Sequence, residues 1–370
     1  DLPGVLDERS SLYEHCVRAV QRGLRFGSHG LPLMGTGDWN DGMNKVGEKG
    51  TGESIWLGFF LYDVLVKFAR IASGQGDGVF AGLCRKEAAQ LKQNIEHSGW
   101  DGNWYRRAYC DDGTILGSCG STECRIDSIA QSWSVLSGAG DAERVRQAMG
   151  EVDKILVNRE DKLVQLLSPP FDTSEIEPGY IKGYVPGVRE NGGQYTHAAI
   201  WAAMAFAALG DRVRAWDVLN IINPINHAGS PEEVDVYKVE PYVVASDVYA
   251  SPPHVGHGGW TWLSGSAAWM YRLIVESLLG LSIQNGKISF SPCLPADWKE
   301  IKIHYHHGET LYHIVVRQHD SETDQPGLTL DGLVVSGPEI VMADDHQEHT
   351  IEVAVLLPAP TAQPPGQLPS

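Results

Sequence analysis

The hydrophobic pattern changes its period once along the chain, near residue 281. Before that point, apolar residues recur with helical spacing in eight segments, at about 12–26, 53–73, 80–97, 127–137, 141–157, 194–209, 211–222 and 264–279. After it, short runs alternate apolar and polar residues, which is typical of strands with one buried face. We therefore expect a mainly α protein, with a helical domain over 1–280 and an antiparallel β-sandwich over 281–357. Residues 358–370, rich in Pro, Gln and Gly, are expected to be disordered.

The predicted helices alternate in character along the first domain. The segment 53–73 is apolar nearly all round and must be covered on most sides, whereas 80–97 carries one apolar stripe among polar residues and belongs outside. The same alternation recurs in the next two pairs of helices. Inner and outer helices in consecutive pairs predict an (α/α)6 toroid, which needs twelve helices to close. Since eight are predicted, we expect the N-terminal helices of the toroid to be missing and the chain to be a fragment or a processed piece.

Composition and charge narrow the range of partners. The net charge is −18 and no basic cluster offsets it, which opposes binding to nucleic acid or to an anionic membrane surface. The most apolar run, 55–66, contains an aspartate and is too short to cross a bilayer. The six cysteines show no C-x-x-C spacing and are expected to be free thiols in a reducing, cytoplasmic compartment. No cluster of residues with metal-ligand spacing is apparent in the sequence.

The motif that points most directly to chemistry is Gly-Thr-Gly-Asp-Trp-Asn-Asp-Gly-Met-Asn at residues 35–44. It sets Asp38 and Asp41 on either side of Trp39, between glycines that let the backbone turn sharply and approach a ligand. An indole offers the flat apolar face on which a sugar ring packs. A carboxyl group beside such a face can be desolvated, which raises its pKa and suits it to donate a proton. The motif therefore suggests cleavage of a glycosidic bond, and the alternative is a turn whose side chains bond their own backbone.

Two predicted helix starts are candidate anion sites. The loop 179–197 places His197 in the first turn of a helix, where exposed N–H groups and the helix dipole favour negative charge. Ser264 is expected to cap the last helix, and its hydroxyl together with the Gly265 N–H could hold a phosphate oxygen. Each has a plainer alternative, with His197 as a satisfied core histidine and Ser264 as a cap alone. The loop 240–249 supplies acids and aromatics suited to the rim of a sugar site.

Four stretches in order resemble the glycoside phosphorylases of glycoside hydrolase family 94, and most of all the C-terminal phosphorylase-like region of cyclic β-1,2-glucan synthases. They are residues 30–44, 123–133, 185–197 (ending Gly-Gly-Gln-Tyr-Thr-His) and 259–266 (Gly-Trp-Thr-Trp-Leu-Ser-Gly-Ser). The similarity runs from about residue 10 to residue 300. It implies an (α/α)6 barrel with a C-terminal β-sandwich, and inverting cleavage of a β-glucosidic bond by inorganic phosphate.

The resemblance also implies roles for individual residues. Asp41 matches the general acid of the family. Trp39 matches a residue that lines the −1 sugar subsite, and Glu190 matches a −1 sugar contact. Apart from these matches, Asp38, Arg189 and Tyr184 are further expected substrate contacts. The expected phosphate ligands are His197, Ser264 and Gly265, with Ser264 standing where many members have threonine. The family's phosphate-binding arginine and further −1 contacts lie upstream of the acid motif, in a part that this chain lacks, so activity of the chain alone is in doubt.

Three functions stay open from the sequence. The first is an inverting phosphorylase of β-glucan, with β-1,2 linkages expected, that releases α-glucose 1-phosphate and uses phosphate as co-substrate without any cofactor. The second is an inverting hydrolase with Asp41 as acid and Glu190 as base, since hydrolysis needs a second carboxylate to activate water. The third is a non-catalytic module that binds glucan and senses its length. Expected partners are a β-glucan or glucooligosaccharide, phosphate, and either the upstream part of the same polypeptide or a dimer partner. The expected location is cytoplasmic, including the soluble part of an inner-membrane synthase.

Overall fold

The computed structural model describes residues 9–319 and 327–356. Contacts between residues divide the chain into two units, 1–270 and 271–370. The 358–370 tail expected to be disordered lies outside the described residues. Within the described ranges, no helix combines the length and the apolar character needed to cross a membrane.

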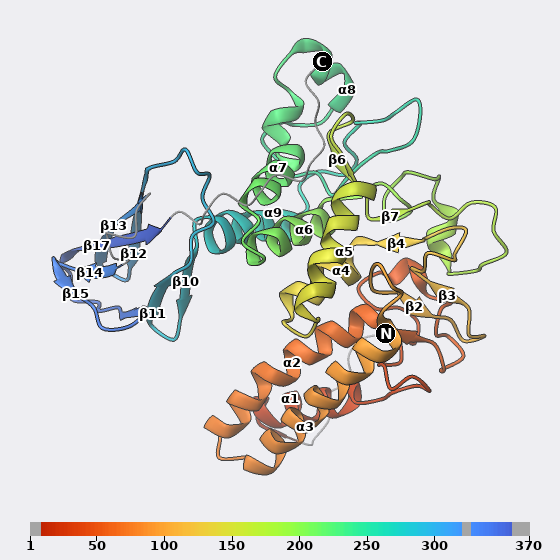
Figure 1. Cartoon of the computed structure of the whole chain (residues 1–370), viewed down its shortest axis with the longest axis horizontal. Helices are drawn as coiled ribbons and strands as arrows, with labels where there is room; N and C mark the ends of the chain where they lie inside the picture. The colour runs from red at the N-terminus through yellow and green to blue at the C-terminus, as the bar shows by residue number, and fades with distance from the viewer. Residues whose placement is uncertain (1–8, 320–326, 357–370) are drawn as a thin grey trace. The chain divides into compact units, whose positions relative to one another are not determined.

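Three consecutive helix pairs form the frame of the first unit (Figure 1). A largely buried helix packs on a more exposed one in each pair: α2 (Ile55–Gly74) on α3 (Gly78–Asn94), α4 (Ser128–Leu136) on α5 (Ala142–Ile155), and α6 (Thr196–Ala208) on α7 (Arg212–Ile222). The buried helices also pack on one another in order, α2 on α4 and α4 on α6. The alternation of inner and outer helices is therefore present in these three pairs. Closure into a toroid stays a prediction.

The remaining helices differ from the sequence pattern at their ends. The first helix, α1 (Leu12–Gly23), begins with a capping box of Ser11 and Glu14 but ends before residue 26. The last, α9 (Ser264–Arg272), contains Ser264 as its first residue instead of following it as a cap, and it continues as a π-helical turn. The expected helices at 80–97 and 264–279 end in the π-helical turns Ile95–Gly99 and Leu273–Leu278. The short elements that the pattern missed are α8 (Pro231–Tyr237) and the 3₁₀ turns Asp41–Met43, Tyr180–Gly183 and Pro224–His227.

Each inner helix of the three pairs follows directly on a two-residue strand. These strands are β1 (Glu53–Ser54) before α2, β4 (Ile126–Asp127) before α4, and β8 (Gln194–Tyr195) before α6. Their antiparallel partners are β2 (Ala108–Tyr109), β7 (Leu167–Ser168) and β9 (Asp247–Val248), while β3 (Ile115–Leu116) pairs with β2 and β5 (Val157–Asn158) with β6 (Leu163–Val164). Strand pairing thus fixes the path by which the chain enters each inner helix.

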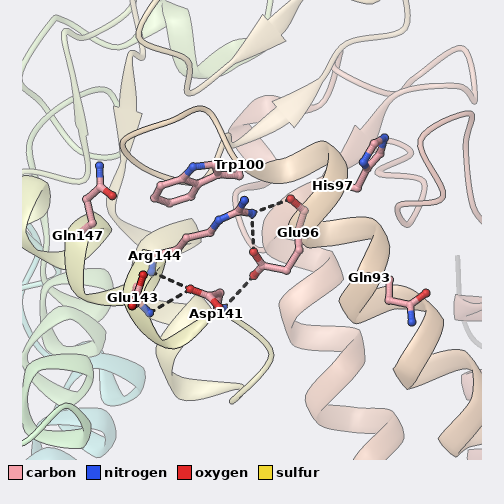
Figure 2. Close-up of a pocket in the computed structure, with 8 residues that line it drawn as sticks. All are labelled: Gln93, Glu96, His97, Trp100, Asp141, Glu143, Arg144 and Gln147. Carbon is pink, nitrogen blue, oxygen red and sulfur yellow. Dashed lines mark hydrogen bonds and ion pairs between the residues drawn. The ribbon is translucent and has the colours of Figure 1, made fainter.

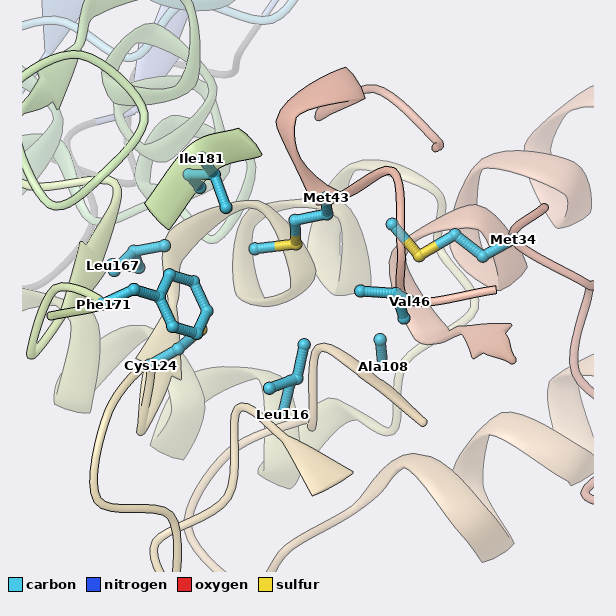
Figure 3. Close-up of a cluster of buried hydrophobic side chains, with 9 residues drawn as sticks. All are labelled: Met34, Met43, Val46, Ala108, Leu116, Cys124, Leu167, Phe171 and Ile181. Atoms are coloured by element: carbon cyan, nitrogen blue, oxygen red, sulfur yellow. The ribbon is translucent and has the colours of Figure 1, made fainter. Parts of the chain in front are cut away.

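A buried cluster anchors the loop that carries the acid motif (Figure 3). Its members are Met34, Met43, Val46, Ala108, Leu116, Cys124, Leu167, Phe171 and Ile181, none of which is more than 3% exposed. Met43 follows Asp41 by two residues and is completely buried. Flexible thioether side chains fill irregular gaps between such segments. The motif is therefore packed into the unit on one side and is not a free surface turn.

The second unit contains two sheets. The larger has the strand order β12 (Glu300–His307), β13 (Thr310–His319), β17 (Glu348–Leu356), β14 (Gly327–Leu330) and β15 (Leu333–Val334). The smaller has the order β10 (Leu281–Gln284), β11 (Lys287–Phe290) and β16 (Glu339–Val341). The expectation of an antiparallel fold is wrong at one pairing, because β13 and β17 run parallel. Alternation of apolar residues marks the buried face of a strand but says nothing about the direction of its partner.

Candidate active site

Aromatic side chains from three segments meet around Trp39. Its ring is edge-on to those of Tyr195 and His197, with centroids 5.3 and 5.4 Å away, and tilted against that of Trp201 at 5.3 Å. His197 and Trp201 both lie on α6, and each also contacts the ring of Trp269 on α9 at 5.6 Å. The acid-motif loop, the start of α6 and α9 therefore converge at one place.

Asp41 is exposed, at the first position of the 3₁₀ turn Asp41–Met43. Its carboxylate is hydrogen-bonded to the phenol of Tyr180, and desolvation together with this bond raises the pKa of Tyr180 to about 12. The desolvation of Asp41 expected beside Trp39 is not present in this structure, because the carboxylate is open to solvent. A ligand seated against Trp39 would have to supply that apolar cover.

Several buried polar atoms near this point have no hydrogen-bond partner among the described residues. Besides Trp201 Nε1 and Asn40 Nδ2, they include Glu190 Oε2, His197 Nε2 and Asp247 Oδ2. Buried polar atoms in native proteins are nearly always paired, and leaving one unpaired costs about 1–3 kcal/mol. Their concentration at one place indicates a site built to receive the polar groups of a ligand.

Two of these orphan atoms belong to neighbouring carboxylates. Glu190 is 6% exposed and Asp247 is 3% exposed. Burial raises the pKa of Glu190, the charges of Asp41 and Asp247 add to the rise, and Arg189 opposes it. Asp247 Oδ1 accepts hydrogen bonds from its neighbour Ser246 and from a backbone N–H, so only Oδ2 remains available. Glu190 Oε2 and Asp247 Oδ2 could each accept a hydrogen bond from a sugar hydroxyl.

Arg189 forms the cationic side of the site. Its Nε lies 3.3 Å from Glu190 Oε2, an ion pair without hydrogen-bond geometry. The guanidinium also lies over the rings of Tyr184 and Trp260, with 4.9 and 5.4 Å to the ring centroids. Arg189 has a φ of 52°, an uncommon value outside glycine that is often found at functional sites. The structure thus brings Tyr184, Arg189 and Glu190 together as expected substrate-binding candidates, and the contacts themselves stay predictions.

His197 occupies the first turn of α6 as the sequence predicts. Burial lowers its pKa to about 4, so the imidazole is neutral at pH 7. The residue before the helix, Tyr195, gives the first-turn amides no side-chain cap. An uncapped helix start beside a neutral imidazole with a free nitrogen favours an anion at this point.

The other two phosphate candidates lie at the start of α9. Ser264 and Gly265 are exposed. Their helix is tied to the site by Trp269, which follows Ser264 by five residues, between one and two helical turns. Their phosphate contacts stay predictions. Among residues 9–319 and 327–356, no three His, Cys, Asp or Glu side chains are placed to share a metal ion.

Asp38 lies beneath the site, contrary to the sugar contact expected for it. Its side chain is 0% exposed. Arg107 donates to both carboxylate oxygens at 2.7 Å, the Asn40 N–H donates to Oδ1 at 3.0 Å, and the Ser54 hydroxyl donates to Oδ2 at 2.6 Å. No acceptor position is left for a sugar hydroxyl. We therefore correct the role of Asp38 from substrate contact to support of the acid-motif loop.

Sequence reasoning missed several side chains that build this site. Trp201 lies on a helix that is apolar on all sides, so periodicity gives no sign of which face meets the ligand. Trp269 and Tyr195 fall within predicted helices, at 264–279 and 194–209, whose side chains were expected to form the core. Arg107 carried no local signal at all, because its partner Asp38 lies 69 residues away.

A hollow of about 650 Å³ lies elsewhere, between the end of α3 and the start of α5 (Figure 2). Its charged groups already pair with one another: Arg144 donates to Glu96 Oε2 at 2.7 Å, and Glu96 Oε1 accepts from the Tyr105 hydroxyl at 2.6 Å. The guanidinium of Arg144 also lies 5.1 Å from the centroid of the Trp100 ring. None of its lining side chains has one of the unpaired buried polar atoms found near Trp39. The unpaired atoms therefore favour the site around Trp39 over this hollow.

Comparison with known proteins agrees with the placement of these residues in a catalytic domain. The model of the "Glycosyl hydrolase 94 superfamily, catalytic domain" matches residues 4–280. The chain belongs to this superfamily. The cyclic β-(1,2)-glucan synthase NdvB of Rhizobium meliloti (strain 1021) is 47% identical over 333 residues, which cover 90% of this chain and 12% of that protein. Solabiose phosphorylase of Paenibacillus borealis is 32% identical over 361 residues, covering 94% and 45% of the two chains.

A further glycoside phosphorylase and two solved structures are also similar to this chain. The 1,2-β-oligoglucan phosphorylase of Listeria innocua is 30% identical over 131 residues, covering 31% of this chain and 12% of that protein. A sialidase structure matches with a TM-score of 0.57 at 14% identity, over 79% of this chain and 26% of the sialidase. The GH78 rhamnosidase of Bacillus sp. GL1 matches with a TM-score of 0.54 at 14% identity, over 94% and 32%. These two structures share the fold, and the chain spans less than half the length of each of these relatives.

Proposed function

We propose that this chain carries the proton donor, sugar contacts and phosphate contacts of an inverting phosphorylase that cleaves β-glucosidic bonds, with β-1,2-linked glucan as the expected substrate. The observation that carries the proposal is the contact of Trp39 with His197, which has an unpaired nitrogen at the uncapped start of α6. Asp41 follows Trp39 by two residues and lies close enough to Glu190 and Tyr195 for its charge to raise the pKa of both. Membership of the superfamily and similarity to a glucan synthase and to phosphorylases support it. We also propose that the three helix pairs belong to an (α/α)6 toroid.

The proposed reaction follows from the charges at the site. A glucosyl unit packs on Trp39, and its hydroxyls donate to the free oxygens of Glu190 and Asp247. Protonated Asp41 gives its proton to the glycosidic oxygen as the C1–O bond breaks. Phosphate, held by His197 and the start of α6, attacks C1 from the opposite face and forms α-glucose 1-phosphate. A shortened glucan leaves, and Asp41 regains a proton from solvent.

A hydrolase remains the second candidate because of Glu190. This carboxylate is buried and has a raised pKa, to which the charge of Asp41 contributes. Its Oε2 is ion-paired with Arg189 but accepts no hydrogen bond. An inverting hydrolase needs a base of this kind to activate water. In a phosphorylase the same group would contact the sugar, because phosphate arrives as an anionic nucleophile.

The decisive experiment measures sugar release from β-1,2-glucooligosaccharides by the complete protein, with and without inorganic phosphate. A phosphorylase forms α-glucose 1-phosphate only when phosphate is present. A hydrolase releases unphosphorylated sugar even when phosphate is absent. Asp41→Asn should reduce turnover by about 10²–10⁴-fold, the usual contribution of a general acid. Asp297→Asn, which changes an exposed carboxylate of the second unit, serves as the matched control. Glucan binding without turnover under either condition would favour a non-catalytic module.

A further inference from the structure

A buried ionic cluster lies directly beneath the acid-motif loop. Arg107 is completely buried. Its two terminal nitrogens, Nη1 and Nη2, each donate a hydrogen bond to the Asp38 carboxylate at 2.7 Å. Its Nε donates to Asp127 Oδ2 at 3.2 Å, and Nη1 also reaches the Ser54 hydroxyl at 3.3 Å. Paired parallel hydrogen bonds between a guanidinium and a carboxylate fix direction as well as distance. Arg107 thus holds Asp38 in one orientation.

The cluster is itself fixed to two inner helices. Ser54 is the N-cap of α2 and accepts from the Leu57 N–H at 3.0 Å. Asp127 is the N-cap of α4 and accepts from the Ile129 N–H at 2.9 Å. Arg107 therefore connects the N-terminal ends of α2 and α4 to the loop that carries Asp38.

A short chain of hydrogen bonds leads from Asp38 to Asp41. Asp38 Oδ1 accepts from the Asn40 N–H at 3.0 Å, and Asn40 Oδ1 accepts from the Gly42 N–H at 3.1 Å, capping the turn that begins at Asp41. The loop is also tight, since a Cβ at Gly37 would lie 3.2 Å from Asp41 Cα. The Asp41 side chain is exposed, but the backbone that carries it is fixed by the hydrogen bonds of Asp38 and Asn40.

The ion pairs of this cluster are expected to add little to the free energy of unfolding. Two carboxylates and one guanidinium are all at most 1% exposed. Removing such charges from water is costly, and apolar replacements of buried ion pairs are often neutral or stabilising. Burial raises the pKa of Asp127 to about 6, although Arg107 opposes the rise. What the cluster does supply is a fixed orientation for the segment that begins at Asp38.

We propose that Arg107 is a positioning residue for the proton donor, acting through Asp38 and Asn40 to hold Asp41 where it can protonate the glycosidic oxygen. This inference rests on the proposed function, in which Asp41 is the general acid. A positioning role has a specific consequence. Loss of the cluster's geometry should slow the reaction only when the leaving group needs a proton.

The test compares two glucosyl donors in the complete protein, each with inorganic phosphate and with α-glucose 1-phosphate as the measured product. In a β-1,2-glucooligosaccharide the leaving group is the oxygen of the shortened glucan, which needs a proton to leave. In β-glucosyl fluoride the leaving group is fluoride, which departs without a proton as phosphate attacks C1. Arg107→Lys keeps the charge but loses the fork of donors. It should lower kcat on the glucan by about 10- to 100-fold, the effect expected of a displacement of order 1 Å, and leave kcat on the fluoride within about threefold. The KM for phosphate should not change.

Matched variants separate the possible outcomes. Arg125→Lys alters an exposed arginine close in sequence to Asp127 and should change neither reaction. Asp38→Asn keeps the volume and one acceptor and should show the same selective loss, so it serves if Arg107→Lys does not fold. Equal losses on both donors, or no loss on the glucan, would overturn the positioning role. Asp41→Asn tests the proposed function separately. If this substitution lowers turnover of the glucan and of the fluoride by the same factor, Asp41 is not the general acid. No turnover of either donor by the unaltered protein would overturn both proposals.

Discussion

An anion that binds beside His197 should bring a proton into the site. Burial lowers the pKa of this imidazole to about 4 in the free protein. At pH 5.5 only about 3% of a group with that pKa is protonated. The uncapped start of α6 and the free Nε2 are the features that would place a tetrahedral anion close to the ring.

The size of the effect follows from Coulomb's law. Counting only one of the two charges of an anion such as sulfate, about 4 Å from the imidazole at an effective dielectric constant of about 20, the protonated form is favoured by about 4 kcal/mol. That energy corresponds to a rise of about three pKa units, from about 4 to about 7. At pH 5.5 the ring would then be almost fully protonated, and binding would take up about 0.9 proton per anion.

Calorimetric titration with sulfate can measure this uptake, because sulfate keeps the same charge across the pH range used. Titrations at pH 5.5 in buffers with different heats of ionisation give the number of protons taken up per bound ion. We expect about 0.9 for the unaltered protein and for the control His97→Asn, and almost none for His197→Asn. Uptake below about 0.2 in the unaltered protein, or equal uptake in His197→Asn, would refute the assignment of His197 to an anion site.

Further predictions concern the same groups and the packing around them. Because the folded-state pKa of His197 lies below 6.5, its contribution to stability is complete above pH 6.5 and is lost as the pH falls toward 4, and sulfate should reduce that loss in urea unfolding. His197→Ala should raise the KM for phosphate far more than the KM for glucan, and equal effects would place His197 elsewhere. Met43→Ala should destabilise the protein by about 2–5 kcal/mol in denaturant unfolding.

Helical periodicity located the three helix pairs because the inner helices α2 and α6 are apolar over most of their surface, whereas the outer helices carry more polar residues. The pattern failed for α8 and for the 3₁₀ turns, which are too short to show a period. It also failed for the direction of β17. A parallel partner joins strands far apart in sequence, and nothing within either strand records that choice.

Sequence reasoning could bring candidate residues together where a short motif carries its own chemistry, and could not where the surroundings of a side chain depend on a distant partner. The roles of the candidates in binding and catalysis stay predictions. Trp39 and His197 were found from local sequence and lie in contact. Asp38 was misjudged because its environment is set by Arg107, whose position in the fold the motif cannot reveal. The exposure of Asp41 was also missed, since burial depends on what the rest of the fold places around a loop.

The position of β17 makes the larger sheet of the second unit depend on the last described strand of the chain. The order β12–β13–β17–β14–β15 places β17 between two hairpins, which pair with it and not with each other. Isolated two-stranded hairpins are marginally stable in water. During synthesis on the ribosome, both hairpins must therefore wait with an unpaired edge until residues 348–356 emerge, so a stop codon before this strand would leave two separate hairpins instead of a shortened sheet.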